Sequence, residues 1–274
     1  MELSCVLIED DNREDFDSVF PLSYELPDWG VAVACVNEDD YILGAVSYQL
    51  VDFEYIIDWL YVEPSVRRQG VGTYLLDQVL RSVVQSGDIF PVTAQFEFRE
   101  DDDILHSFFL SCRIMTTTYS HERYYLSADD VRSSNALHKL GNSELTVELF
   151  FDKPIEEQKR ILTMLAREES YWVTDYDGWK ESCIPELCQA VYINNNLLDL
   201  IFMTRLPNGN LELSYLYGKY PKGLMELLGN TVSKVETLYP DSSLTFDAIN
   251  DESRLLAQHL FPKAKTAHIY EAQF

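Results

Sequence analysis

The chain has 274 residues, of which 46% are hydrophobic and 13% aromatic, and it carries a formal net charge of -25. This length exceeds what one compact core usually organises, so the sequence predicts two globular domains. An acidic surface repels phosphate backbones and anionic lipids, which argues against nucleic acid and membranes as partners. We interpret the acidity mainly as a source of solubility, with a cation-attracting substrate site as the alternative.

The amino terminus lacks a basic segment followed by an apolar run, so a first strand is expected there rather than a signal peptide. No apolar stretch approaches the roughly 18 residues that would span a bilayer. The five cysteines form no CxxC pair, which indicates neither a disulfide framework nor a zinc site. A cytoplasmic protein without a metal is therefore expected.

Hydrophobic periodicity in the first half predicts an α/β fold with a mixed sheet and flanking helices. Strands are expected at 3–8, 29–36, 41–51, 54–62, 90–98 and 114–126, the last as one or two closing strands of this half. Helices are expected at 14–20, 73–84 and 102–112. The segment 127–143 is rich in Ser, Asp, Asn and Gly, so it is expected to connect two domains, 1–140 and 141–274.

The second half repeats the order of elements of the first, which indicates a duplication. Its expected elements are a strand at 145–151, a helix at 154–168 and strands at 187–193 and 197–205. Tyr215-Leu216-Tyr217 then matches Trp59-Leu60-Tyr61, and the tail 251–270 matches 102–124.

A loop with the sequence Arg67-Arg68-Gln69-Gly70-Val71-Gly72-Thr73 joins a predicted strand to a predicted helix. A pyrophosphate needs converging N–H donors, and the start of a helix presents unpaired donors with a positive partial charge. Gly70 and Gly72 let the backbone approach a ligand, the two arginines add charge, and Thr73 adds a hydroxyl. The loop is therefore predicted to bind an anion, with an ordinary glycine turn as the alternative. It has neither the GxxxxGK pattern of a P-loop nor the three spaced glycines of a Rossmann turn.

The same loop resembles the Q/R-x-x-G-x-G/A signature of the GNAT family of N-acetyltransferases, and the preceding Leu60-Tyr61-Val62-Glu63-Pro64 is also similar to that family. The resemblance implies two GNAT-like domains, the second degenerate, with 218–223 in place of the loop. It implies acetyl-CoA as cosubstrate and transfer of an acetyl group to a primary amine of a small-molecule or peptide acceptor. The implied cofactor-binding residues are Tyr61, Val62, Arg67, Arg68, Gln69, Gly70, Val71, Gly72 and Thr73. A non-catalytic acyl-CoA binding or sensing protein is the alternative.

The resemblance also suggests catalytic groups. An amine must lose a proton before it attacks a thioester, and Asp58 is the candidate carboxylate, acting directly or through water. A carboxylate bonded locally beside Trp59 is the alternative. The N–H of Val62 is the implied donor to the oxyanion. Many family members carry a tyrosine as general acid where this chain has Phe109, so His106, Ser107 or water would have to replace it.

Overall fold

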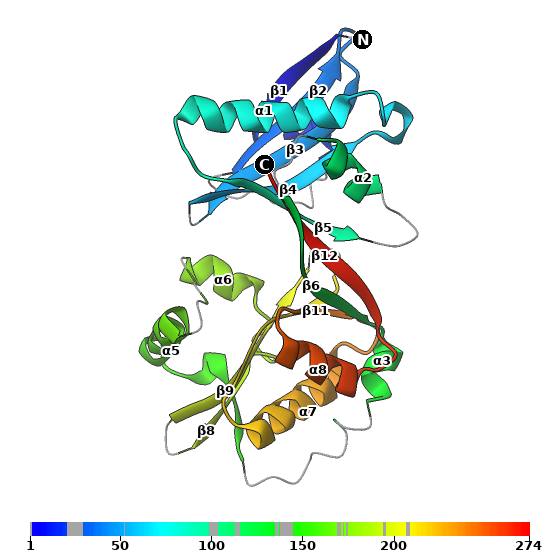
Figure 1. The fold of residues 1–274 in the computed structure, drawn as a ribbon. Coiled ribbons are helices and arrows are strands. Elements are labelled where there is room, and N and C mark those ends of the chain that lie inside the picture. The colour runs from blue at the N-terminus through cyan, green and yellow to red at the C-terminus, as the bar shows by residue number, and fades with distance from the viewer. Residues whose placement is uncertain are drawn as a thin grey trace. The chain divides into compact units, whose positions relative to one another are not determined.

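The computed structural model describes residues 2–20, 30–51, 53–98, 104–112, 116–134, 137, 145–168, 171, 173, 175–193, 196–206 and 209–274 (Figure 1). The chain forms two compact units, which are called unit 1 (residues 1–120 and 268–274) and unit 2 (residues 121–267). The boundary expected at residue 140 lies outside the described residues, so the division into 1–140 and 141–274 stays a prediction. No described helix is long and apolar enough to cross a membrane.

The sheet of unit 1 is mostly antiparallel. Its strands, in spatial order, are β1 (Leu3–Ile8), β2 (Gly30–Asn37), β3 (Ile42–Val51), β4 (Glu54–Val62), β5 (Val92–Phe98) and β12 (Lys265–Gln273), the last from residue 268 onward. Only β4 and β5 run parallel among these neighbours. A parallel pair needs a crossover connection, and α1 (Val71–Ser86) supplies it (Figure 1).

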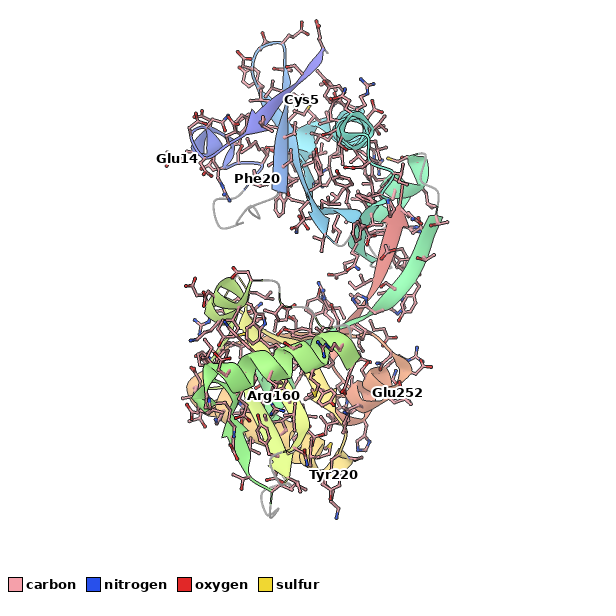
Figure 2. The ribbon with its side chains drawn as sticks, turned by 90° about the vertical axis from the view of Figure 1, so that its left-hand side faces the viewer. Cys5, Glu14, Phe20, Arg160, Tyr220 and Glu252 are labelled. Atoms are coloured by element: carbon pink, nitrogen blue, oxygen red, sulfur yellow. The ribbon has the colours of Figure 1, made fainter. Side chains whose placement is uncertain are left out.

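Helices cover one face of this sheet and an irregular segment covers the other. The buried residues of α1 pack with the sheet and with α2 (Ile104–Ser111) into one core. On the opposite face, the 3-10 helix η1 (Arg13–Phe16) and Phe20, labelled in Figure 2, form a second core. A helix was expected at 14–20, but only this one short turn forms.

The strand that closes each sheet comes from the other half of the chain. β6 (Thr116–Leu126) was expected to close the first sheet, but its residues 122–126 pair antiparallel with β11 (Leu244–Ala248) of unit 2. In unit 1 the C-terminal strand β12 pairs antiparallel with β5 instead. Both closing strands have the composition of a strand, so the local pattern fixes their conformation but not their partner.

Unit 2 has the same arrangement. Its strands, in spatial order, are β6, β11, β10 (Leu211–Gly218), β9 (Asn196–Arg205), β8 (Gln189–Ile193) and β7 (Val147–Leu149). Its helices are α3 (Ala128–Arg132), α5 (Ile155–Glu168), α6 (Tyr176–Ser182), α7 (Pro221–Leu238) and α8 (Asp251–Leu260), with a 3-10 turn η3 (Phe150–Asp152). β10 and β11 are parallel, and α7 connects them.

The two units match in detail as well as in order. The parallel pairing covers three residue pairs in each, Tyr55–Val92 to Ile57–Ala94 in unit 1 and Leu211–Leu244 to Leu213–Phe246 in unit 2. The five buried positions of α1 (Val71, Leu75, Leu76, Val79 and Val83) have the same spacing as five of the six buried positions of α7 (Gly223, Leu227, Leu228, Thr231 and Val235); the sixth is Val232. The predicted α/β class, with two similar mixed sheets flanked by helices, is confirmed.

Candidate functional site

A gap opens between β4 and β5 of unit 1. The two strands pair only as far as Ile57 and Ala94, although β4 continues to Val62 and β5 to Phe98. β5 keeps a partner on its other edge, because β12 pairs with it through Phe98. Beyond Ile57 the facing edges of β4 and β5 therefore carry backbone groups without a strand between them.

A β-bulge lies at the point where the gap begins. Trp59 pairs with Ser47 of β3 and Ile57 pairs with Tyr48, so Asp58 is the extra residue. Because of this extra residue, the side chains that face α1 are at odd-numbered positions before the bulge and at even-numbered positions after it. Tyr55 and Ile57 before it pack in the core under α1, as do Leu60 and Val62 after it, whereas Trp59 and Tyr61 pack in the opposite core.

The peptide groups of Val62 face the gap. Glu63 donates its N–H to the carbonyl oxygen of Leu43 on β3 at 2.9 Å. Because successive residues of a strand direct their N–H groups to opposite edges, the N–H of Val62 points away from β3. Arg67 donates from Nε to the carbonyl oxygen of Val62 at 3.0 Å, which fixes the loop to the end of β4.

The loop before α1 contains two residues in the left-handed backbone region. Arg68 and Gly70 have positive φ angles of 63° and 89°. A side chain at position 70 would meet no atom within 4 Å, so glycine is favoured there for its φ angle and not for space. The first helical bond of α1 runs from the N–H of Tyr74 to the carbonyl oxygen of Gly70 at 2.9 Å. The N–H groups of residues 71–73 precede it and have no acceptor within the helix.

The start of α1 packs closely against α2. A Cβ at Gly72 would lie 3.0 Å from the ring of Phe108, so this glycine permits the approach of the two helices. Burial raises the pKa of the thiol of Cys112, just beyond α2, and the nearby Thr73 hydroxyl offsets part of the increase. Cys112 is therefore a packing residue under the loop rather than a reactive thiolate.

A cleft of about 970 Å³ joins the loop to the gap. Its lining residues come from β4, the loop, β5 and α2: Leu60, Tyr61, Val62, Arg67, Arg68, Gly70, Gly72, Thr73, Glu97, Ile104, Leu105, Ser107, Phe108 and Ser111. Seven of the nine residues proposed to bind the cofactor are thus brought together. The other two do not line it: Gln69 donates to the carbonyl oxygen of Ser65 at 3.3 Å, and the side chain of Val71 is 1% exposed in the core.

The proposed catalytic carboxylate lies outside the lining of this cleft. Asp58 is exposed at the bulge, where Gln49 donates from Nε2 to its Oδ1 at 3.2 Å. Its role stays a prediction. Glu97, whose side chain lines the cleft, was not singled out from the sequence. The only signal was its place between Phe96 and Phe98 in a predicted strand, which puts it on the face away from theirs.

The helix α2 contributes no tyrosine to the cleft. Phe109 is 3% exposed and packs against Phe96 and Phe274 at ring distances of 4.8 and 5.7 Å. His106 packs beside Phe98 at 5.3 Å, so Ser107 is the one of the two suggested replacements that lines the cleft.

Residues 3–109 match the acetyltransferase (GNAT) family. Among curated proteins, none matches the chain in sequence. Three solved structures are similar in fold. A tandem GNAT protein from the clavulanic acid biosynthesis pathway has a TM-score of 0.72 at 14% identity, over 99% of this chain and 98% of that one. A GCN5-related N-acetyltransferase from Sphaerobacter thermophilus has a TM-score of 0.66 at 14% identity, over 99% and 95%. A glucosamine N-acetyltransferase region of a fungal GH3 β-N-acetylglucosaminidase has a TM-score of 0.69 at 13% identity, over 100% of this chain and 38% of that one.

The family match covers the residues that build the loop, the gap and most of the cleft, whereas the structural likeness extends over the whole chain. Unit 2 repeats the topology of unit 1. Residues 3–109 therefore match the GNAT acetyltransferase family, and the fold of the whole chain is similar to that of a tandem GNAT protein.

Proposed function

We propose that this protein transfers an acetyl group from acetyl-CoA to a primary amine, using the cleft of unit 1. The observation that carries the proposal is that one cleft is lined both by the loop with Arg67 and Arg68 and by the end of β4, which no longer pairs with β5 there. The loop suits the pyrophosphate, and the edge suits the amide groups of the pantetheine arm, which would lie along β4 as an added strand.

Cofactor binding and oxyanion stabilisation have candidate groups in this cleft, whereas the candidate base, Asp58, lies outside its lining. The amides at the start of α1, together with Arg68, would hold the phosphates. The N–H of Val62 would donate to the thioester oxygen as it becomes an oxyanion. Asp58 is retained as a carboxylate that assists deprotonation of the amine through water. The net charge of -25 favours a cationic or otherwise basic acceptor.

Cofactor binding is tested with Arg68→Gln, measured by calorimetry with acetyl-CoA. Loss of one charge-assisted bond of about 1.5 kcal/mol is expected to weaken binding about tenfold. Arg81→Gln is the matched control, because Arg81 lies on α1, which follows the loop, has a side chain that is 66% exposed, and pairs with Asp77 instead of lining the cleft. Equal affinities of the two variants would contradict the assignment of the loop.

Catalysis is tested by the release of free thiol from acetyl-CoA in the presence of polyamines, aminoglycosides, amino acids and peptides. Acceptor-dependent release is expected, and its loss in Asp58→Asn would support a role for that carboxylate. Tight binding of acetyl-CoA without release for any acceptor would favour the non-catalytic sensing protein, in keeping with the phenylalanine at position 109.

A further inference from the structure

Glu97 stands out because it is the one carboxylate among the described residues that line the cleft. The two other charged lining residues, Arg67 and Arg68, belong to the loop. The cleft thus has cationic groups on the loop before α1 and an anionic group on β5. A charge arrangement of this kind fits two different ligands, one bearing phosphates and the other bearing an ammonium group.

The position of Glu97 follows from how β5 is paired. Glu97 is opposite Ile269 of β12, which is buried, so the backbone at this point is held in register. On the other edge β5 has already parted from β4, three residues earlier at Ala94. Glu97 therefore lies on a strand that is held by β12 on one edge and is not paired with β4 on the other. A ligand in the gap could contact its side chain without displacing a strand.

The face on which Glu97 lies is set by its neighbours. Phe96 and Phe98 both pack against His106 of α2, with ring distances of 6.4 and 5.3 Å. Glu97 therefore points to the other face of β5. Tyr61, which also lines the cleft, packs on that same face of the sheet, away from α1. The cleft thus passes between the strands, from the loop and α2 on one face to Tyr61 and Glu97 on the other.

We propose that Glu97 binds the ammonium group of the acceptor and is the base that removes its proton. This proposal rests on the acetyl transfer proposed above and assigns the acceptor side of the cleft. Glu97 takes one proton from the ammonium and passes it to solvent. The neutral nitrogen then forms a bond to the thioester carbon, and the carbon–sulfur bond breaks. The second proton leaves the nitrogen and goes to the thiolate, giving the amide and free CoA.

The test compares Glu97→Gln with Asp58→Asn in the full chain, using the best acceptor from the panel. Glu97→Gln is expected to lower kcat/KM at least about 100-fold, the usual contribution of a general base, while acetyl-CoA affinity stays within about twofold. Glu97→Asp is expected to recover part of the activity. Asp58→Asn is expected to reduce kcat/KM less than Glu97→Gln does. Near-normal activity of Glu97→Gln, or the reverse order of the two losses, would overturn the assignment.

Two further measurements separate a base from a residue that only shapes the site. Hydroxylamine is largely neutral near pH 7.5, so the loss of kcat/KM in Glu97→Gln is expected to be smaller with this acceptor. An equal loss would contradict the assignment of Glu97 as the base. If no acceptor in the panel is acetylated, the proposed acetyl transfer is contradicted. The binding of spermidine to the complex of the protein with CoA then tests whether Glu97 binds an ammonium group. Weaker binding by Glu97→Gln supports the ammonium site, whereas equal or absent binding in both proteins overturns it.

Discussion

The first turns of α1 and α7 occupy equivalent places in the two units. They differ in what lies next to the backbone N–H groups that have no acceptor within the helix. In unit 1, residues 63–70 join β4 to the first buried position of α1, and the turn is open to the cleft. In unit 2, residues 219–222 make the same connection, with half as many residues. The strand register identifies a second difference, because Gly44 pairs with Val62 in unit 1 and Asp199 pairs with Gly218 in unit 2.

Asp199 lies at the start of α7 in unit 2, at the register position that Gly44 occupies in unit 1. Its side chain is fully buried, and its Oδ1 accepts the N–H of Tyr220, the residue before α7, at 2.9 Å. A Cβ at Gly223 would lie 2.0 Å from Oδ2, so the carboxylate sits over the first turn of this helix. At position 44 of unit 1 a Cβ would lie 2.4 Å from the carbonyl oxygen of Tyr61, so there is no room for a side chain that could cap α1 from this position. One fold thus satisfies the start of α7 with its own carboxylate and leaves the start of α1 facing a cleft.

The largest effect is expected when unit 1 is given an internal carboxylate of its own. Thr73→Glu places one in the first turn of α1, where it repels phosphates, and about 2.7 kcal/mol of repulsion lowers acetyl-CoA affinity about 100-fold. The melting temperature is not expected to fall by much, because a carboxylate complements the helix dipole at this end. Calorimetry checks the affinity, with Thr73→Ser as the control. Unchanged affinity in Thr73→Glu would place the cofactor elsewhere.

An intermediate effect is expected from emptying the equivalent place in unit 2. Asp199→Ala removes the acceptor of the Tyr220 N–H from a buried position and is expected to destabilise α7 by about 2 kcal/mol. Amide hydrogen exchange of α7, followed by mass spectrometry, measures this change. The exposed Asp241, mutated to Ala, is the control. Full protection of α7 in Asp199→Ala would mean that this carboxylate does not stabilise the helix start.

The smallest effect concerns pH. Burial raises the pKa of Asp199 above its ordinary value of 3.8, and the N–H groups of Tyr220 and Lys219 counter only part of the increase. A carboxyl group whose pKa is raised on folding stabilises the folded chain less as the pH rises above that ordinary value. Asp199→Asn lacks this loss, so its free energy of unfolding is expected to increase relative to wild type as the pH rises. Parallel pH profiles of the two proteins would contradict the expectation.

The parts of the fold that the sequence predicted well are those encoded by local signals. Strand β4, the loop from Arg67 to Thr73 and helix α1 follow from β-branched residues, two glycines and leucine spacing within one short segment. The pairing of β5 with β12 depends on residues far apart in the chain, so no local pattern identifies it. The same limit explains why the pairing of β6 with β11 of unit 2 was not predicted.

The candidate site was predictable where a motif defines it and not where tertiary structure does. The bulge at Asp58 has no glycine or other marker, so its effect on which side chains face α1 was not foreseen. Glu97 enters the cleft only because β4 and β5 part beyond Ala94. Likewise, Asp199 looks like a polar residue in a strand until the strand register places it at the start of α7.

The central claim is that the start of α1 in unit 1 is open and binds an anion, whereas the start of α7 in unit 2 is capped by Asp199. Calorimetric titration of the full-length protein with acetyl-CoA tests it most directly. We predict one molecule bound per chain, with that binding lost in Thr73→Glu. Two molecules per chain, or one that Thr73→Glu still binds with wild-type affinity, would contradict the claim.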